Sequence, residues 1–307
     1  MVRAAARYCP NVLDPREAID RINRAYGTHP GHRALHAHGS YYTGTFTGSP
    51  EARRLCRAAA FSGDPVPVLV RWSNAAGDPR RPDKAPDIRG MAVKFRAPGG
   101  DLDLVAQTQP RFPVRTPEDF VSLTYASQHR PTLPLWLLRH PSALPALREA
   151  VRTKAAGSPF SYAEPAYYAI HAYGWLDADG DRTWVRYQLV PLAAREDRPA
   201  GVFEGKRRLS DEMAARLAEG PVLYDLIVKR AGRNDDPHDP MSVWSRVDAV
   251  TAGRLEISAA AEDPERDGGP VVFDPTRVTD GIELSDDPIL RYRAAAYSES
   301  VARRTAT

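Results

Sequence analysis

The sequence predicts an α+β fold in which antiparallel strands form a barrel or a sandwich and helices are inserted at its margins. Two observations support this class. Runs rich in β-branched and aromatic residues follow one another along the chain, separated by short Pro, Gly and Asp turns, and they do not alternate with helical patterns. The 28 prolines and 21 glycines also indicate many turns and ordered loops around this core.

The strands are predicted from period-two patterns between turn signals. The clearest pair is a hairpin whose turn, DADGD at 177–181, contains Asp-Gly and is flanked by alternating aromatic and β-branched residues. In chain order, the predicted strands are 66–73, 90–95, 102–107, 169–176, 183–190, 222–230 and 254–258.

Four helices are predicted from their capping signals and apolar periodicity. The first opens at Asp14-Pro15 and ends near Gly27, and the last opens at Asp287-Pro288 and runs through Arg304. Between them lie a candidate at 145–155 and a helix capped by Ser210 that Gly220 ends. No internal repeat or linker appears. We therefore expect one domain over 1–307, with an N-terminal arm and helix over 1–28 and a terminal helix over 287–304.

Composition excludes several classes of function. The 42 Lys and Arg against 39 Asp and Glu give a net charge of +3, and the basic residues are dispersed, which argues against a nucleic-acid partner. Cys9 and Cys56 are the only cysteines, so no disulfide framework is expected and a reducing compartment fits. The sequence shows neither a signal-peptide pattern nor a membrane span, and the expected location is cytoplasmic.

The last helix carries a pair of residues with a specific chemistry. Arg293 and Tyr297 are four residues apart, so they lie on the same helical face. Tyrosine ligates heme iron as its phenolate, and a guanidinium held against the phenol oxygen favours that anion. Alone, the pair is weak evidence, because most such pairs combine packing with a solvated charge.

Five segments of the chain, taken in order, resemble segments of the heme catalase superfamily. They are HRALHAHGS at 32–40, VRWSNAAGDP at 70–79, PDIRGMAVKF at 86–95, DLVAQTQPRFPVRTPEDF at 103–120 and FDPTRVTDGIELSDDPILRYRAAAYSES at 273–300. The resemblance covers roughly 15–304 and is thin over 125–165 and 192–250. It implies a heme-binding antiparallel barrel, heme b, and Tyr297 as the axial iron ligand. Because the chain stops just after the tyrosine helix, it is similar to the short catalase-related peroxidases.

On the distal side of the heme, the resemblance implies that His36 is the general base for a hydroperoxide and that Ser73 orients its imidazole. Gln107 stands where the family has an asparagine, so its amide would reach a different point over the iron. Misplacement by about 1 Å can cost ~100-fold in rate. We therefore expect poor hydrogen peroxide dismutation.

The same comparison predicts a wider pocket that admits organic hydroperoxides and a small-molecule reductant. Ala75 replaces the family's channel valine, and Pro113 is matched to a pocket phenylalanine, so both changes remove bulk. Phe120 matches the remaining aromatic residue over the heme face. Asp87 matches a channel aspartate, although a turn residue before Ile88 is nearly as good an interpretation.

Residues that hold the heme follow from the resemblance too. Arg33, Arg71 and Arg304 match the family's propionate-binding arginines. His171 matches the histidine that supports the arginine of the tyrosinate pair, and it would lie in a hairpin strand. Asp287 matches the acidic end of that relay and is also a natural helix N-cap.

The leading functional hypothesis is a heme peroxidase that reduces organic hydroperoxides, and hydrogen peroxide, with an external electron donor. Three alternatives stay open within heme chemistry: a fatty-acid hydroperoxide isomerase of the allene oxide synthase type, a true catalase, and a heme store or sensor, which would not need His36 and Ser73. A zinc module built on the histidines between His29 and His38 is a fourth. A homodimer is a hypothesis that nothing in the sequence decides.

Overall fold

A closed antiparallel β-barrel forms the centre of the molecule. The computed structural model describes residues 13–129, 131–192, 197–244 and 248–306. Hydrogen bonding follows the order β10-β6-β7-β5-β4-β3-β2-β1-β9-β8, and pairing of β7 with β8 closes the barrel. The strands are β1 (Gly39–Gly48), β2 (Pro65–Asn74), β3 (Arg89–Ala97), β4 (Gly100–Gln107), β5 (Tyr167–Tyr168), β6 (Tyr173–Leu176), β7 (Arg182–Pro191), β8 (Val222–Arg230), β9 (Asp248–Ala261) and β10 (Ile282–Leu284).

Side-chain alternation explains why the barrel is filled and yet offers an outer face to a ligand. In β2, Val68, Val70 and Trp72 point inward and join the largest hydrophobic cluster of the protein. Arg71 and Ser73, which alternate with them, lie on the outer face. The interior is therefore an apolar core, and the polar residues of the same strands are available outside it.

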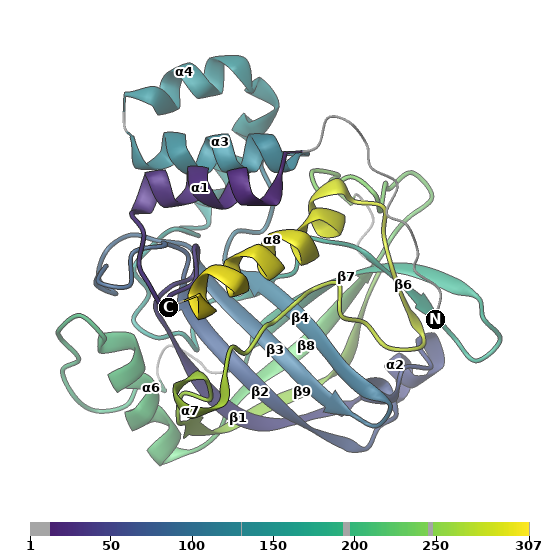
Figure 1. Ribbon diagram of the computed structural model, residues 1–307. Coiled ribbons are helices and arrows are strands. Elements are labelled where there is room, and N and C mark those ends of the chain that lie inside the picture. Colours follow the sequence, from purple (N-terminus) through teal and green to yellow (C-terminus); the bar gives the residue numbers. More distant parts are fainter. Residues whose placement is uncertain (1–12, 130, 193–196, 245–247, 307) are drawn as a thin grey trace.

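The helices cover part of the outer face (Figure 1). Helix α8 lies across the strands near β3 and β4, with α1 and α3 side by side above it. No helix in the described part of the chain is long and apolar enough to cross a membrane. The helices are α1 (Pro15–Tyr26), α2 (Pro50–Leu55), α3 (Pro117–Gln128), α4 (Thr132–Arg139), α5 (Leu144–Arg152), α6 (Arg208–Glu219), α7 (Glu265–Gly268) and α8 (Pro288–Thr305).

The predicted barrel is confirmed, with differences in its elements. β1 was not predicted, because its glycines look unfavourable for a strand. They are needed for close approach: a Cβ at Gly44 would lie 1.9 Å from the carbonyl oxygen of Glu256 in β9. The predicted strand 169–176 is shorter and begins at Tyr173. The predicted cap Ser210 lies inside α6, whose N-cap is Arg207, and the Ser210 Oγ instead meets the Ser40 Oγ at 2.7 Å.

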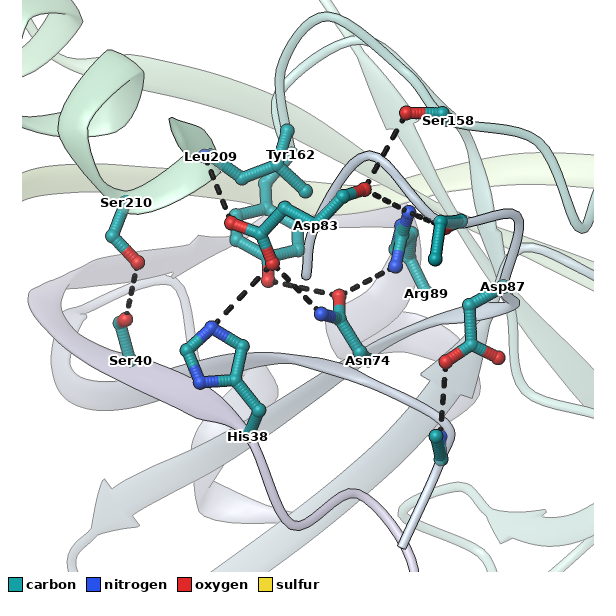
Figure 2. A network of polar contacts seen from close by, with 12 residues as sticks. His38, Ser40, Asn74, Asp83, Asp87, Arg89, Ser158, Tyr162, Leu209 and Ser210 are labelled. Carbon is teal, nitrogen blue, oxygen red and sulfur yellow. Dashed lines mark hydrogen bonds and ion pairs between the residues drawn. The ribbon is translucent and has the colours of Figure 1, made fainter. Parts of the chain in front are cut away.

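A buried polar network lies at the end of β2, around its last residue Asn74 (Figure 2). The carboxylate of Asp83 accepts hydrogen bonds from Asn74 Nδ2 (2.7 Å) and from the Leu209 N–H (3.0 Å). His38 Nε2 lies 3.4 Å from the same carboxylate. Burial acts to raise the pKa of Asp83, but these three donors outweigh it and leave the pKa below its usual value.

Arg89 completes this network by fixing the chain around Asp83. Its guanidinium donates to Asn74 Oδ1 at 2.6 Å and to the carbonyl oxygens of Asp83 and Ala85 at 2.8 and 3.0 Å. Asn74 therefore uses both ends of its amide, one toward Asp83 and one toward Arg89. Because Asn74 is the last residue of β2 and adjoins Ser73, the network stiffens the strand end that carries Ser73.

Replacing Asp83 with Ala should destabilise the protein by about 3 kcal/mol, because it leaves Asn74 and the Leu209 amide buried without an acceptor. Urea unfolding measures this loss. Asp280→Ala is the control, since the Asp280–Arg57 ion pair is exposed and its loss should change stability by less than about 0.5 kcal/mol. Equal effects of the two substitutions would contradict a structural role for the network.

Candidate active site

One large cavity lies between the outer face of the barrel and the helices α1, α3 and α8. It contains about 1450 Å³ of space free of protein atoms, open solvent included. Most of the predicted site residues line it together: Arg33, His36, Arg71, Ser73, Gln107, Phe120, Arg293, Tyr297 and Arg304.

The register of three neighbouring strands builds the strand wall of this cavity. Gly90 in β3 is paired with Ser73 in β2 on one side and with Gln107 in β4 on the other. The three residues thus form a row across the sheet. A Cβ at Gly90 would lie 2.7 Å from His36 Cε1 and 2.8 Å from its Nδ1, so the glycine leaves the space in which the imidazole sits. Gly90 was not predicted as a site residue, although a glycine inside a strand is the signal that marks it.

His36 is held in an unusual backbone conformation. Its φ is 55°, a left-handed value that costs a non-glycine residue about 1–3 kcal/mol. Two backbone hydrogen bonds keep it there: the His36 N–H donates to the Ala75 carbonyl (3.0 Å) and the Ala37 N–H to the Ala76 carbonyl (3.1 Å). This backbone conformation places the imidazole against Gly90 of β3.

The imidazole of His36 is kept neutral. Burial first, and then the charges of Arg71, Arg293 and Arg33, lower its pKa to about 3. Its Nδ1 is 2.9 Å from the Ser73 Oγ. A neutral ring that donates from Nδ1 to this hydroxyl has a free lone pair on Nε2, which is the form a general base requires.

Gln107 stands at the end of the same row. Its Nε2 is buried and has no hydrogen-bond partner among the described residues. Because a buried amide without a partner costs about 1–3 kcal/mol, a ligand atom is the expected acceptor. A residue that lines the cavity thus keeps an unused donor, and the role predicted for it over the iron stays a prediction.

The helix wall carries Arg293 and Tyr297. Arg293 Nη1 donates to the Tyr297 phenol oxygen at 2.9 Å, so the predicted pair is formed along one face of α8. Both side chains also line the cavity, so the paired phenol and guanidinium face the same space.

Asp287 combines the two roles that the sequence left in competition. Its Oδ1 accepts from the N–H groups of Ile289 and Leu290 and so caps α8, while its Oδ2 lies 2.6 Å from His171 Nδ1. His171 lies in the bend between β5 and β6 rather than in a hairpin strand, because the predicted strand begins later. The hydrogen bond with His171 and the N-cap therefore coexist on one carboxylate, and the relay beyond His171 stays a prediction.

The charge state of this pair follows from its surroundings. Burial lowers the pKa of His171 to about 4, against the opposing effect of its hydrogen bond to Asp287 and with the charge of Arg293 adding to the shift. For Asp287 the hydrogen bonds outweigh burial and hold the pKa below its usual value. A neutral imidazole therefore donates to an ionised carboxylate. The charge of Arg293 acts on His171, although no hydrogen bond joins the two side chains.

Arg33, Arg71 and Arg304 line the cavity together. Arg71 is buried and donates to the His36 carbonyl at 2.9 Å, and burial together with the charge of Arg33 lowers the pKa of Arg71 to about 10. The Nε atoms of Arg71 and Arg304 are buried without partners in the described part of the chain. Such unsatisfied donors suit a ligand with carboxylates.

The aromatic wall differs from the prediction. Phe112, not Pro113, lines the cavity, and its ring stacks on Phe120 with centroids 5.7 Å apart. The bulk expected to be missing at Pro113 is therefore present one residue earlier. Asp87 accepts hydrogen bonds from the Ala76 and Ile88 N–H groups and acts as a turn residue. Neither Ala75 nor Asp87 is among the residues that line the cavity.

A zinc module on the histidine-rich segment does not match the geometry. His29 Nε2 is 3.0 Å from the Tyr26 carbonyl oxygen, His36 Nδ1 is 2.9 Å from the Ser73 Oγ, and His38 Nε2 is 3.4 Å from the Asp83 carboxylate. Within the described ranges, no group of three or more His, Cys, Asp or Glu side chains is arranged to hold a metal ion. Cys56 is buried and free, and Cys9 lies outside the described residues.

This fold and site define a class of protein: the chain belongs to the catalase family, whose family model matches residues 2–198. It is 47% identical to a catalase-related peroxidase of Mycolicibacterium paratuberculosis, with 95% of each chain covered. It is 28% identical to a catalase-related peroxidase of Synechococcus elongatus, over 98% of this chain and 92% of the relative.

Solved structures agree on the fold. A crystal structure of a fungal catalase superposes with a TM-score of 0.74 at 20% identity, covering 99% of this chain and 65% of that one. Catalase A from Saccharomyces cerevisiae gives a TM-score of 0.75 at 19% identity, covering 99% and 67%. The chain thus spans about two thirds of those catalases. Family membership makes the protein a heme peroxidase, an oxidoreductase that acts on peroxide.

The residues present fit a heme. The cavity combines a tyrosine whose phenol is held by an arginine, three arginines for two carboxylates, a stacked aromatic pair and apolar walls. The unsatisfied buried donors of Gln107, Arg71 and Arg304 also lie on residues that line it. This chemistry matches an iron porphyrin better than a smaller cofactor.

The backbone strain at His36 generates a prediction about stability. His36→Gly should be more stable than His36→Ala by about 1 kcal/mol, because only glycine adopts φ 55° without cost. Chemical denaturation of both variants measures the difference. At the exposed helical residue Arg53 the same two substitutions should give the opposite order, since glycine weakens a helix. The same order at both positions would mean that His36 is not strained.

The space left by Gly90 generates a second prediction. Gly90→Ala should displace the imidazole and slow hydroperoxide consumption by ~100-fold, while the heme spectrum is retained. Steady-state kinetics on the heme-loaded variant measure this effect. Gly220→Ala is the matched control, because a Cβ there meets nothing within 4 Å. Unchanged kinetics in Gly90→Ala would show that the glycine does not position His36.

Proposed function

We propose that the protein is a heme b peroxidase that reduces organic hydroperoxides with an external small-molecule electron donor and evolves oxygen from hydrogen peroxide only weakly. One observation carries the proposal: the His36–Ser73 pair and the Arg293–Tyr297 pair line the same cavity, one on the strand wall and one on the helix wall. A heme bound between them would have a base on one face and an anionic ligand on the other.

On the helix side, Tyr297 would bind the heme iron through its phenol oxygen. Arg293 would hold the phenolate, and the His171–Asp287 pair would fix the electrostatic surroundings of that arginine. At the cavity edge, Arg33, Arg71 and Arg304 would bind the propionates, and Phe120 would pack on the ring. These are the roles that the resemblance implies.

On the strand side, the bound heme would supply the iron that polarises the peroxide oxygen and accepts oxidising equivalents from it. His36 would take the proton of the hydroperoxide at Nε2 and return it to the leaving oxygen, while Nδ1 donates to Ser73. A pKa of about 3 keeps this base neutral at physiological pH.

The lining supports an organic substrate. Apolar side chains from α1 (Ile19, Ile22) and α3 (Val121) line the cavity beside the aromatic pair. Such a wall makes favourable contacts with the alkyl or aryl group of an organic hydroperoxide and excludes water. The same wall also suits a hydroperoxide isomerase. The two activities differ in one requirement, because only the peroxidase needs an electron donor.

The test of this proposal is the visible spectrum and the reductant dependence of the purified protein. We expect one heme per chain, a high-spin ferric spectrum and consumption of cumene hydroperoxide that requires a dye reductant. Consumption without reductant would indicate the isomerase, and strong oxygen evolution from hydrogen peroxide would indicate a catalase. The absence of a heme spectrum after growth with iron would refute the proposal.

Tyr297→Phe should lose heme or change the ligation of its iron, because the phenyl ring cannot bind iron. Absorption spectroscopy of the purified variant shows either result. Tyr292→Phe is the control on the same helix: it removes a phenol that also lines the cavity but has no partner among the described residues, and it should keep the spectrum. An unaltered spectrum in Tyr297→Phe would rule out the axial role.

Gln107→Asn should raise oxygen evolution relative to peroxidase turnover, because the shorter amide moves its donor to the position that the family uses. The recovery should be partial. An oxygen electrode and a dye-oxidation assay on the same preparations measure the two rates. If their ratio does not move, amide placement is not what limits dismutation.

A further inference from the structure

A carboxylate of the protein itself occupies the arginines at the cavity edge. Glu265 Oε2 accepts from Arg33 Nη1 at 2.8 Å, and its Oε1 accepts from Arg33 Nη2 at 3.0 Å and from Arg304 Nη1 at 2.9 Å. The Tyr41 hydroxyl and the Val271 N–H also donate to it, each at 2.8 Å. Both oxygens of Glu265 are therefore fully used.

Glu265 reaches this position from the loop that follows β9. It lies in the four-residue helix α7, close to the C-terminal end of α8 (Figure 1). Arg33 belongs to the segment before His36, and Arg304 belongs to the last turn of α8. One carboxylate thus joins three parts of the chain at the cavity edge. Glu265 was not predicted as a site residue, because 262–272 carries no motif.

The arrangement conflicts with simple propionate binding. Arg33 directs both of its terminal nitrogens at Glu265, and the second of them also donates to Tyr41 and to the Val271 carbonyl. A bidentate arginine fork binds one carboxylate at a time. A propionate that uses the Arg33 fork must therefore take the place of the Glu265 carboxylate.

We propose that Glu265 is a displaceable internal carboxylate that occupies the propionate position of Arg33 and Arg304, so that heme binding must displace it. The inference rests on the proposed function, since it takes these arginines as the propionate ligands. Without heme, Glu265 neutralises two buried or half-buried guanidinium groups that would otherwise repel each other. With heme, a propionate takes over this task.

If Glu265 competes with a propionate, removing the negative charge of Glu265 should tighten heme binding. In Glu265→Gln, the side chain keeps its size and loses its charge, so the propionate meets a weaker competitor. Heme affinity should rise by roughly tenfold, the change that one charge-assisted hydrogen bond represents. The heme-free variant should unfold at a lower temperature than the heme-free parent, because its arginines lack a counterion.

The experiment measures heme transfer from the full-length holoprotein to an excess of apomyoglobin, and heme uptake by the heme-free protein, by absorbance. Glu262→Gln is the matched control: it removes the same charge from an exposed position three residues earlier and should change neither rate. Faster heme loss in Glu265→Gln would overturn the proposal, because it would make Glu265 a support for the heme. No change would overturn it as well.

A second probe separates the mechanism from a general effect of charge. Iron protoporphyrin IX dimethyl ester has no free carboxylates, so it cannot compete with Glu265. The gain in Glu265→Gln should be seen with heme and be absent with the ester; equal gains would refute displacement. Should the parent protein bind no heme, the proposed function itself fails. If the parent binds heme but Glu265→Gln shows no gain in heme affinity, only the proposed displacement of Glu265 fails.

Discussion

The site depends on one constraint, the register of β2, β3 and β4. Because Ser73, Gly90 and Gln107 fall in one row, a hydroxyl, an empty space and an amide lie side by side on the outer face of the barrel. The imidazole of His36 enters that empty space. A one-residue slip of any of these strands would turn the residue that it contributes toward the barrel core.

The buried charged groups of the protein are compensated by neighbouring donors and opposite charges. Asp83 is stabilised by neutral donors and by the neighbouring histidine, Asp287 by His171 and two helix N–H groups, and Glu265 by arginines. Each carboxylate also ties together segments that are distant in the chain. The low pKa of His36 belongs to the same pattern, since burial first, and then the arginine charges around the cavity, keep this base neutral.

Much of the fold and of the candidate site could be predicted, because the informative residues lie in short segments with strong local signals. The capped helix after Asp287, the Arg293–Tyr297 spacing and the strand carrying Ser73 are all confirmed as elements. The errors have physical reasons. β1 was missed because its glycines serve close contacts between strands, and α3 because it is covered on more than one side and lacks a single apolar face.

By itself, the sequence determined three things: the barrel class, the family that its motifs resemble, and the spacing of Arg293 and Tyr297. All three depend on local patterns and on residue identity. Only the tertiary structure decided that Phe112 rather than Pro113 forms the aromatic wall, that Asp287 serves two roles at once, and that Glu265 holds Arg33 and Arg304. These facts depend on which side chains meet across more than a hundred residues of chain, or on the direction in which a loop turns. Periodicity and motif spacing carry no information about such contacts.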